Sequence, residues 1–196
     1  SQEIVGPVVG RELQLKGVYA TLASIVGIAV YIAFRFRPAF AVGAIAATLH
    51  DVLITLVFLA FFGYDLSLNI VAALLTITGY SVNDTIVIFD RVRENMRSMR
   101  RDSLEKIVNT AVNQTLSRTV ITAGTTFLSV LALYVFGGEV LHGFAFTMLV
   151  GIVSGTYSTI FIAAAIAIIL GNRQGAGAAA TAGGAVKVKA ATARRS

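Results

Sequence analysis

Asp84 is an ionisable residue inside a long apolar segment, and it is the residue of this sequence best suited to chemistry. The apolar segment leads directly into the basic stretch 91–97. A carboxylate at membrane depth costs about 2.5–3.5 kcal/mol on insertion scales, and such residues usually have a partner and take part in moving ions or protons. The alternative is a structural contact between helices, in which a neighbouring hydroxyl or arginine satisfies the carboxylate.

Polar side chains before Asp84 recur at helical spacing. Asn69, Thr76, Tyr80 and Asn83 are separated by seven, four and three residues, which places them on one helical face. Asp84 lies at the edge of this face. Polar faces of this kind contact other protein or a water-filled cavity rather than lipid. We therefore expect Thr76, Tyr80 and Asn83 to support ion movement at Asp84.

Arg118 is the candidate partner of Asp84. It directly precedes the apolar stretch that begins at Thr119, so it would enter the bilayer from the same side as Asp84. A nearby guanidinium favours the ionised form of a carboxylate, and loss of that contact favours the protonated form. A conformational change could then load and unload a proton. The alternative is an arginine that anchors the end of a span by extending to the interface.

His50 and Asp51 are neighbours near the middle of another apolar segment, deeper than Asp84. Thr48 and Thr55 add hydroxyl groups nearby. Two titratable groups at this depth could extend a proton path. They could equally form a buried His–Asp pair, or Asp51 could cap a neighbouring helix.

Small residues predict close contacts between helices. Gly151 and Gly155 are four residues apart in an apolar segment, a spacing that lets two helices approach closely. Gly79 and Gly124 are candidates for the same role. We expect helix packing at these positions.

Several functional classes are excluded. The absence of cysteine rules out disulfides, thiolate zinc sites and cysteine nucleophiles. A single histidine beside an aspartate gives no metal-ligand spacing, and no glycine-rich phosphate loop or Ser/His/Asp constellation is present. The segment 79–84 lacks the Gly-x-Gly-Asp arrangement of intramembrane aspartyl proteases. We expect no covalent catalysis, no metal and no cofactor beyond a coupling ion.

The composition is that of a polytopic membrane protein. Hydrophobic residues make up 56% of the chain and charged residues 13%, with a mean hydropathy of +0.80. Soluble domains carry about 25% charged residues, and a spanning helix needs about 20 mostly apolar residues. Five segments meet this requirement: 18–36, 40–62, 66–89, 119–136 and 143–170. The short connections predict sequential antiparallel neighbours in one all-α bundle.

The basic residues predict the orientation. If 35–37, 91–118 and the C-terminal region share one side, that side holds 14 of the 16 Lys and Arg residues, and it is cytoplasmic by the positive-inside rule. The net charge of +6 then reflects topology rather than nucleic-acid binding. Residues 1–16 would be periplasmic and the C-terminus cytoplasmic, and we expect a translocating segment upstream of residue 1.

Two further regions differ in composition from the apolar segments. The pattern over 102–116 predicts an amphipathic helix at the cytoplasmic interface, with Asp102 as its N-cap. Residues 172–196 are rich in Gly and Ala and basic, which is typical of a disordered tail.

Six motifs in a fixed order resemble those of SecF-like proteins, the bacterial protein-export membrane proteins of the SecD/SecF family. This family belongs to the resistance–nodulation–division (RND) type of transporter. The resemblance covers about residues 1–171 and is carried by Val5–Gly10, Leu49–Leu53, Gly79–Asp84, Phe89–Asn95, Asn113–Thr119 and Phe136–Glu139.

The resemblance implies a fold of six spans in the bacterial inner membrane. Residues 17–171 would supply the second to sixth spans and the cytoplasmic interfacial helix, and residues 1–16 would be the end of a periplasmic domain. On this resemblance, we expect the first span and nearly all of that domain to be absent from this chain. The resemblance also implies that Asp84 and Arg118 couple a proton or sodium gradient to transport.

The implied partners are SecD, the SecYEG channel and YajC, with unfolded secretory protein as cargo and membrane lipid as surroundings. On this hypothesis Asp84 is ionised when paired with Arg118 and protonated when the contact opens, and each cycle shifts helices that meet the periplasmic domain. Two alternatives remain. The chain could be a passive scaffold that stabilises the channel complex, or part of an RND-type exporter of other cargo.

Overall fold

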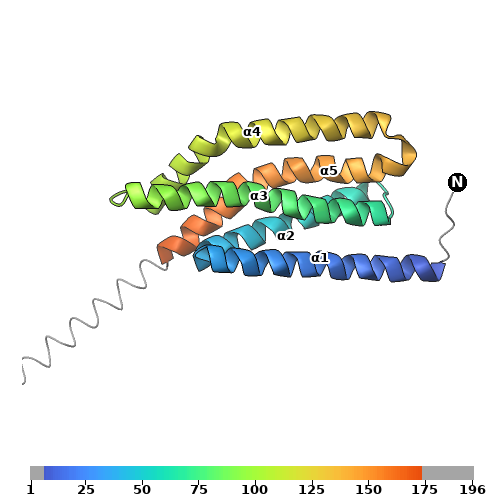
Figure 1. Cartoon of the computed structure of the whole chain (residues 1–196), viewed down its shortest axis with the longest axis horizontal. Coiled ribbons are helices and arrows are strands. Elements are labelled where there is room, and N and C mark those ends of the chain that lie inside the picture. Colours follow the sequence, from blue (N-terminus) through green and yellow to red (C-terminus); the bar gives the residue numbers. More distant parts are fainter. Residues whose placement is uncertain (1–6, 174–196) are drawn as a thin grey trace, which may run out of the picture.

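Long helices account for the whole architecture of the computed structural model, which describes residues 7–173 (Figure 1). No strand occurs within that range. The elements are α1 (Pro7–Arg35), α2 (Pro38–Phe61), α3 (Leu68–Ser98), α4 (Leu104–Phe136), α5 (Gly138–Ser158) and a π-helical segment, η1 (Thr159–Ala163). Helical residues continue from η1 to residue 173.

Five helices are long and apolar enough to span a membrane, which confirms the prediction of an all-α polytopic membrane protein. The candidate span in α1 begins at Leu15, and the last span runs from Gly138 to Arg173 through η1. The helices lie roughly along one axis, and consecutive helices run in opposite directions (Figure 1). The predicted periplasmic end overlaps the start of α1, and residues 1–6 and the tail beyond 173 lie outside the described range.

Local sequence explains where the helices begin and turn. The Ser67 side chain accepts a hydrogen bond from the Ile70 amide and caps α3, and Pro38 occupies the first turn of α2, where its missing amide costs no bond. Gly63 and Gly138 both have a φ of 73°, a conformation that side chains disfavour; Gly63 lies in the short α2–α3 connection and Gly138 is the first residue of α5.

The predicted interfacial helix over 102–116 and the span over 119–136 are consecutive parts of one helix, α4. The early part of α4 is inclined to the rest, as Figure 1 shows. The prediction of Asp102 as N-cap was wrong by one residue. Ser103 accepts from the Lys106 amide at 3.3 Å, whereas the Asp102 carboxylate accepts from the Lys106 ammonium group at 2.7 Å.

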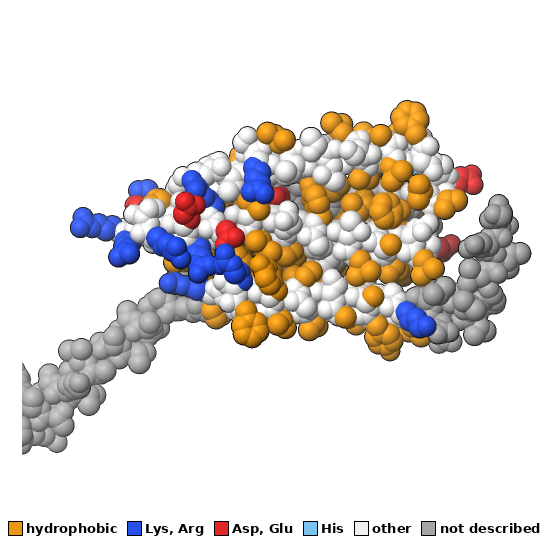
Figure 2. All heavy atoms as spheres, in the orientation of Figure 1, with side chains coloured by type: hydrophobic (Ala, Val, Ile, Leu, Met, Phe, Trp, Pro, Cys, Tyr) orange, Lys and Arg blue, Asp and Glu red, His pale blue; other side chains and the backbone are white. Residues whose placement is uncertain are grey.

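α3 is the central helix and contacts α1, α2, α4 and α5. At one end of the bundle Phe89 packs edge-to-face on Phe36 and Phe40, and in the middle Ile77 packs against α5 around Met148 and Ile152. Lys and Arg side chains gather at the end where α3 meets α4, and apolar side chains cover much of the remaining visible surface (Figure 2). Because α3 contacts every other helix, a shift of α3 would alter the helix contacts throughout the bundle.

Candidate functional site: two buried carboxylates beside α3

Asp84 is buried between α3 and α4, with 7% of its surface exposed. The hydroxyl of Thr119, which is fully buried on α4, donates to Asp84 Oδ1 across 3.3 Å. Asp84 Oδ2 has no hydrogen-bond partner within the described part of the chain. A buried polar atom without a partner is costly, so this oxygen is suited either to carrying a proton or to receiving a donor in another conformation.

Arg118 lies next to Thr119 and is exposed. It forms no ion pair with Asp84 in this conformation, although its charge is close enough to exert a Coulombic attraction on that carboxylate. The contact of α4 with Asp84 is therefore made by Thr119, the residue that follows Arg118. The direct contact expected from the sequence would require a further movement of the guanidinium group.

Asp51 is the second buried carboxylate and is 1% exposed. Three serine hydroxyls from two other helices donate to it. Ser81 on α3 and Ser158 on α5 reach Oδ2 at 2.6 Å each, and Ser154 on α5 reaches Oδ1 at 2.7 Å. His50 Nδ1 lies 3.2 Å from Oδ1. This set of donors satisfies an ionised carboxylate and joins α2, α3 and α5 at one point.

The sequence did not predict the three serines. The Asp51 carboxylate accepts hydrogen bonds from their hydroxyl groups and does not cap a helix end. Ser154 and Ser158 are four residues apart in an apolar helix, a spacing that places both on the face toward Asp51. That spacing is the signal that could have revealed them. Ser81 gave no comparable signal, because only the packing of α3 on α2 brings it to Asp51.

A hydroxyl contact extends the Asp51 cluster to η1. Thr85 Oγ1 lies 3.2 Å from the carbonyl oxygen of Ser81, to which it donates, and 2.9 Å from Thr159 Oγ1. Thr159 is the first residue of η1. Short π-helical segments occur frequently at functional sites. The irregular part of the last span therefore adjoins the turn of α3 that carries both Ser81 and Asp84.

The predicted polar face of α3 is not fully covered by the part of the chain that the structure describes. Thr76 and Asn83 are exposed and Tyr80 is half-buried. Asn69 donates to the Val140 carbonyl at 3.1 Å, and Thr76 donates to the carbonyl of Ala72 in its own helix. The structure thus brings Asp84 together with Thr119, and leaves Asn83 beside it on the surface of the bundle.

The glycines divide into two groups. A Cβ at Gly151 would overlap the side chain of Ile77, and one at Gly155 would lie 3.1 Å from Ser81 Cβ, so both glycines let α5 approach α3. Gly79 and Gly124 have no neighbouring helix within 4 Å of that position. Within the described part of the chain, neither glycine lies at a close contact between helices.

No group of three or more His, Asp or Glu side chains suited to a metal ion occurs among the described residues.

Comparison with known proteins decides the family. The protein-family model that describes the C-terminal region of the protein-export membrane proteins SecD and SecF matches residues 1–173. The chain belongs to the SecD/SecF family.

Curated members of this family are closely similar. The protein translocase subunit SecF of Koribacter versatilis is 50% identical over 195 residues, which is 96% of this chain and 48% of that protein. The protein of the same name from Escherichia coli O157:H7 is 48% identical over 88% of this chain and 53% of its own length. The chain thus spans about half the length of these SecF relatives.

Solved SecDF structures have the same helical arrangement. The crystal structure of SecDF in its super-membrane-facing form matches with a TM-score of 0.81 and 42% identity, over 90% of this chain and 24% of that one. SecDF from Thermus thermophilus, a translocon-associated membrane protein, matches with a TM-score of 0.81 and 46% identity, over 86% of this chain and 23% of that one. This part of the SecDF fold is therefore present here.

Proposed function

We propose that this chain is the membrane part of a SecF-type subunit that uses a proton or sodium gradient to promote late protein translocation across the bacterial inner membrane. The observation that carries the proposal is the Asp84 carboxylate, which is buried at span depth and has one oxygen without a partner in the described chain. Its neighbour Arg118 supplies a positive charge that a conformational change could bring into contact.

The coupling step follows from this geometry. A proton on Asp84 would remove the attraction to Arg118, and its release would restore that attraction. Because Asp84 contacts α4 through Thr119, either change alters the α3–α4 contact. One charge that crosses the membrane field gains about 2.3 kcal/mol per 100 mV, so a few ions can bias a conformational equilibrium.

SecD is the proposed partner at the uncovered polar surface. Asn83 on α3 is exposed, as are Thr122, Thr125 and Ser129 along α4. The three α4 hydroxyls donate to carbonyls of their own helix, which reduces their cost in an apolar environment but favours protein or water over lipid as a neighbour. The solved relatives called SecDF are about four times as long as the matched part, which leaves room for such a partner.

The remaining assignments follow from family membership and the basic end of the bundle. Clustered Lys and Arg residues at that end support a cytoplasmic orientation by the positive-inside rule, with residues 1–16 as the end of a periplasmic domain. SecYEG and YajC would be the further partners, and an unfolded secretory protein the cargo.

The test is Asp84→Asn in the full-length parent protein, with precursor export and ion flux followed in energised membrane vesicles. Asp65→Asn, in the exposed α2–α3 connection, is the matched control. Loss of gradient-stimulated export with the complex still assembled would support the proposal. Unchanged export and flux would favour the passive scaffold, and ion flux without any effect on export would favour an exporter of other cargo.

A further inference from the structure

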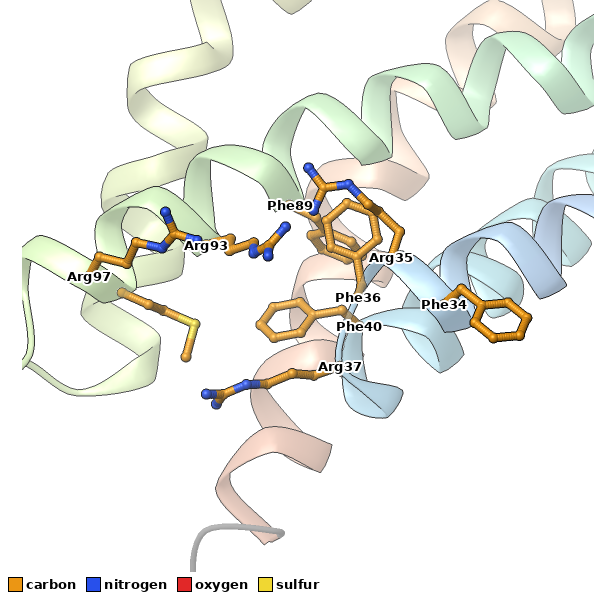
Figure 3. Close-up of a pocket in the computed structure, with 9 residues that line it drawn as sticks. Phe34, Arg35, Phe36, Arg37, Phe40, Phe89, Arg93 and Arg97 are labelled. Carbon is orange, nitrogen blue, oxygen red and sulfur yellow. The ribbon is translucent and has the colours of Figure 1, made fainter.

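A basic pocket lies at the end of the bundle where α1 meets α2, beside the last turns of α3 (Figure 3). Its volume is about 480 Å³, within the range of about 300–1,000 Å³ that small-molecule sites occupy. Four arginines line it: Arg35, Arg37, Arg93 and Arg97. They come from three different helix ends, so the fold gathers charges that are far apart in the sequence.

Most of this positive charge is not neutralised by neighbouring residues. Arg35 pairs with Asp90 at 2.8 Å. Arg37, Arg93 and Arg97 form no ion pair in the described part of the chain. Glu94 lies next to Arg93 in the sequence, but it pairs with Arg91 at 2.6 Å. The pocket therefore has three guanidinium groups available to an anion.

The available arginines point toward one space. In Figure 3 the guanidinium groups of Arg93 and Arg97 extend from α3 toward the α1–α2 turn, and Arg37 extends from that turn toward α3. Guanidinium groups bind phosphate oxygens in pairs, which gives Arg an advantage over Lys in such sites. The arrangement fits a phosphate group better than a single small monovalent anion.

The floor and rim of the pocket are aromatic. Phe89 packs against Phe36 at 6.0 Å and against Phe40 at 5.1 Å between ring centres, and these three rings line the pocket together with the arginines. Phe34 lies at the rim and is 91% exposed. An occupant therefore meets both charge and apolar surface, as a molecule with a phosphate and hydrocarbon chains would.

The pocket lies at the depth of lipid headgroups. The candidate span in α1 ends at Arg35 and that in α2 begins at Pro38, so this turn marks a boundary of the apolar layer. α3 has 31 residues, whereas about 20 suffice to cross the hydrocarbon core, so its last turns with Arg93 and Arg97 extend beyond that core. Basic pockets between spanning helices at this level bind anionic headgroups.

We propose that this pocket binds the phosphodiester headgroup of an anionic phospholipid of the phosphatidylglycerol class, with an acyl chain against Phe34. The chain's own segment 174–196 contains no Asp or Glu, so its side chains supply no competing anion. The proposal is independent of ion coupling at Asp84, because it requires only that the pocket lies at a membrane boundary.

The test uses the full-length parent protein in phosphatidylcholine nanodiscs, with binding of phosphatidylglycerol measured by titration and native mass spectrometry. The pocket variant carries Arg37→Gln, Arg93→Gln and Arg97→Gln. The matched control carries Arg100→Gln, Arg101→Gln and Lys106→Gln, which remove the same charge outside the pocket. We expect the dissociation constant to rise at least about tenfold in the pocket variant and less than about threefold in the control.

Two further arms make the outcome decisive. Arg→Lys changes at the same three pocket positions keep the charge and should still weaken binding, because Lys lacks the paired donors; thermal unfolding checks that each variant is folded. Equal loss in the pocket and control variants would overturn the proposal in favour of general surface attraction. Displacement of the lipid by inorganic phosphate at the same concentration would assign a soluble anion instead, and displacement by an oligoglutamate peptide a protein partner.

Discussion

Ser81 on α3 donates a hydrogen bond of 2.6 Å to Asp51 on α2. Ser81 lies three residues before Asp84 on α3. One turn of α3 thus carries both the serine that donates to the buried Asp51 carboxylate and the buried carboxylate of Asp84. Asp84 accepts a hydrogen bond from Thr119 on α4. The Asp51 cluster has donors on both oxygens, whereas Asp84 retains one oxygen without a partner in the described chain. We infer that Asp51 fixes α3 to α2 and α5, while Asp84 is the group free to change.

Thr119→Val is expected to impair coupling with little change in stability. Valine keeps the shape of threonine but removes the one hydrogen bond that Asp84 accepts within the described chain, so the ionised carboxylate loses a stabilising donor. Hydrogen bonds between membrane helices contribute about 0.6 kcal/mol on average, so the loss of stability should be of that order. Gradient-driven export and unfolding of the full-length protein would both be measured.

Thr110→Val is the control for that prediction. The Thr110 hydroxyl lies near the start of α4 and donates to the Lys106 carbonyl in its own helix, so its loss should leave coupling intact. Equal effects of the two variants on export would contradict a special role for the Thr119–Asp84 contact.

Asp51→Ala is expected to destabilise the bundle by about 2 kcal/mol or more, because several buried hydroxyls lose their acceptor at once. Part of the loss is recovered as serine hydroxyls turn to carbonyls of their own helices. Ser154→Ala alone should cost about 0.6–1.7 kcal/mol. Chemical unfolding in detergent–lipid micelles of both single variants and the double variant would give the coupling energy, and a value of zero would argue against a shared network.

Gly151→Ala is expected to weaken the α3–α5 contact by about 1–3 kcal/mol, the usual cost of overpacking. Its new methyl group would overlap the Ile77 side chain, which is fully buried and cannot move aside freely. Gly124→Ala in α4 meets nothing within 4 Å and should be neutral or stabilising. Unfolding of the two variants under the same conditions provides the measurement, and equal stability of both would show that α5 does not approach α3 so closely.

The sequence predicts the spans well because each one is a long apolar run, and such a run has few structures available to it in a bilayer. It also draws attention to Asp84, whose carboxylate is unusual in such a run, and the structure buries that residue. α4 was harder to predict, because its amphipathic start and apolar remainder look like two elements. No breaker separates them, so the helix continues through Arg118.

The Asp51 cluster shows what sequence alone could not give. Serine in an apolar helix has many uses, and its hydroxyl can bond to its own backbone. Only the packing of α2, α3 and α5 reveals that Ser81, Ser154 and Ser158 converge on one carboxylate. The basic pocket has the same origin, since Arg37 and Arg93 come to line one pocket through the fold and not through any sequence motif.

The most direct test of the account is the protonation of Asp84 itself. Difference infrared spectroscopy of the full-length protein in lipid vesicles, stepped across pH, would follow the carboxylic-acid band. Proton exchange at Asp84 predicts a band that appears on acidification, is missing from Asp84→Asn and is retained in the loop control Asp65→Asn. The same band in Asp84→Asn and in the parent protein at every pH would contradict proton exchange at Asp84.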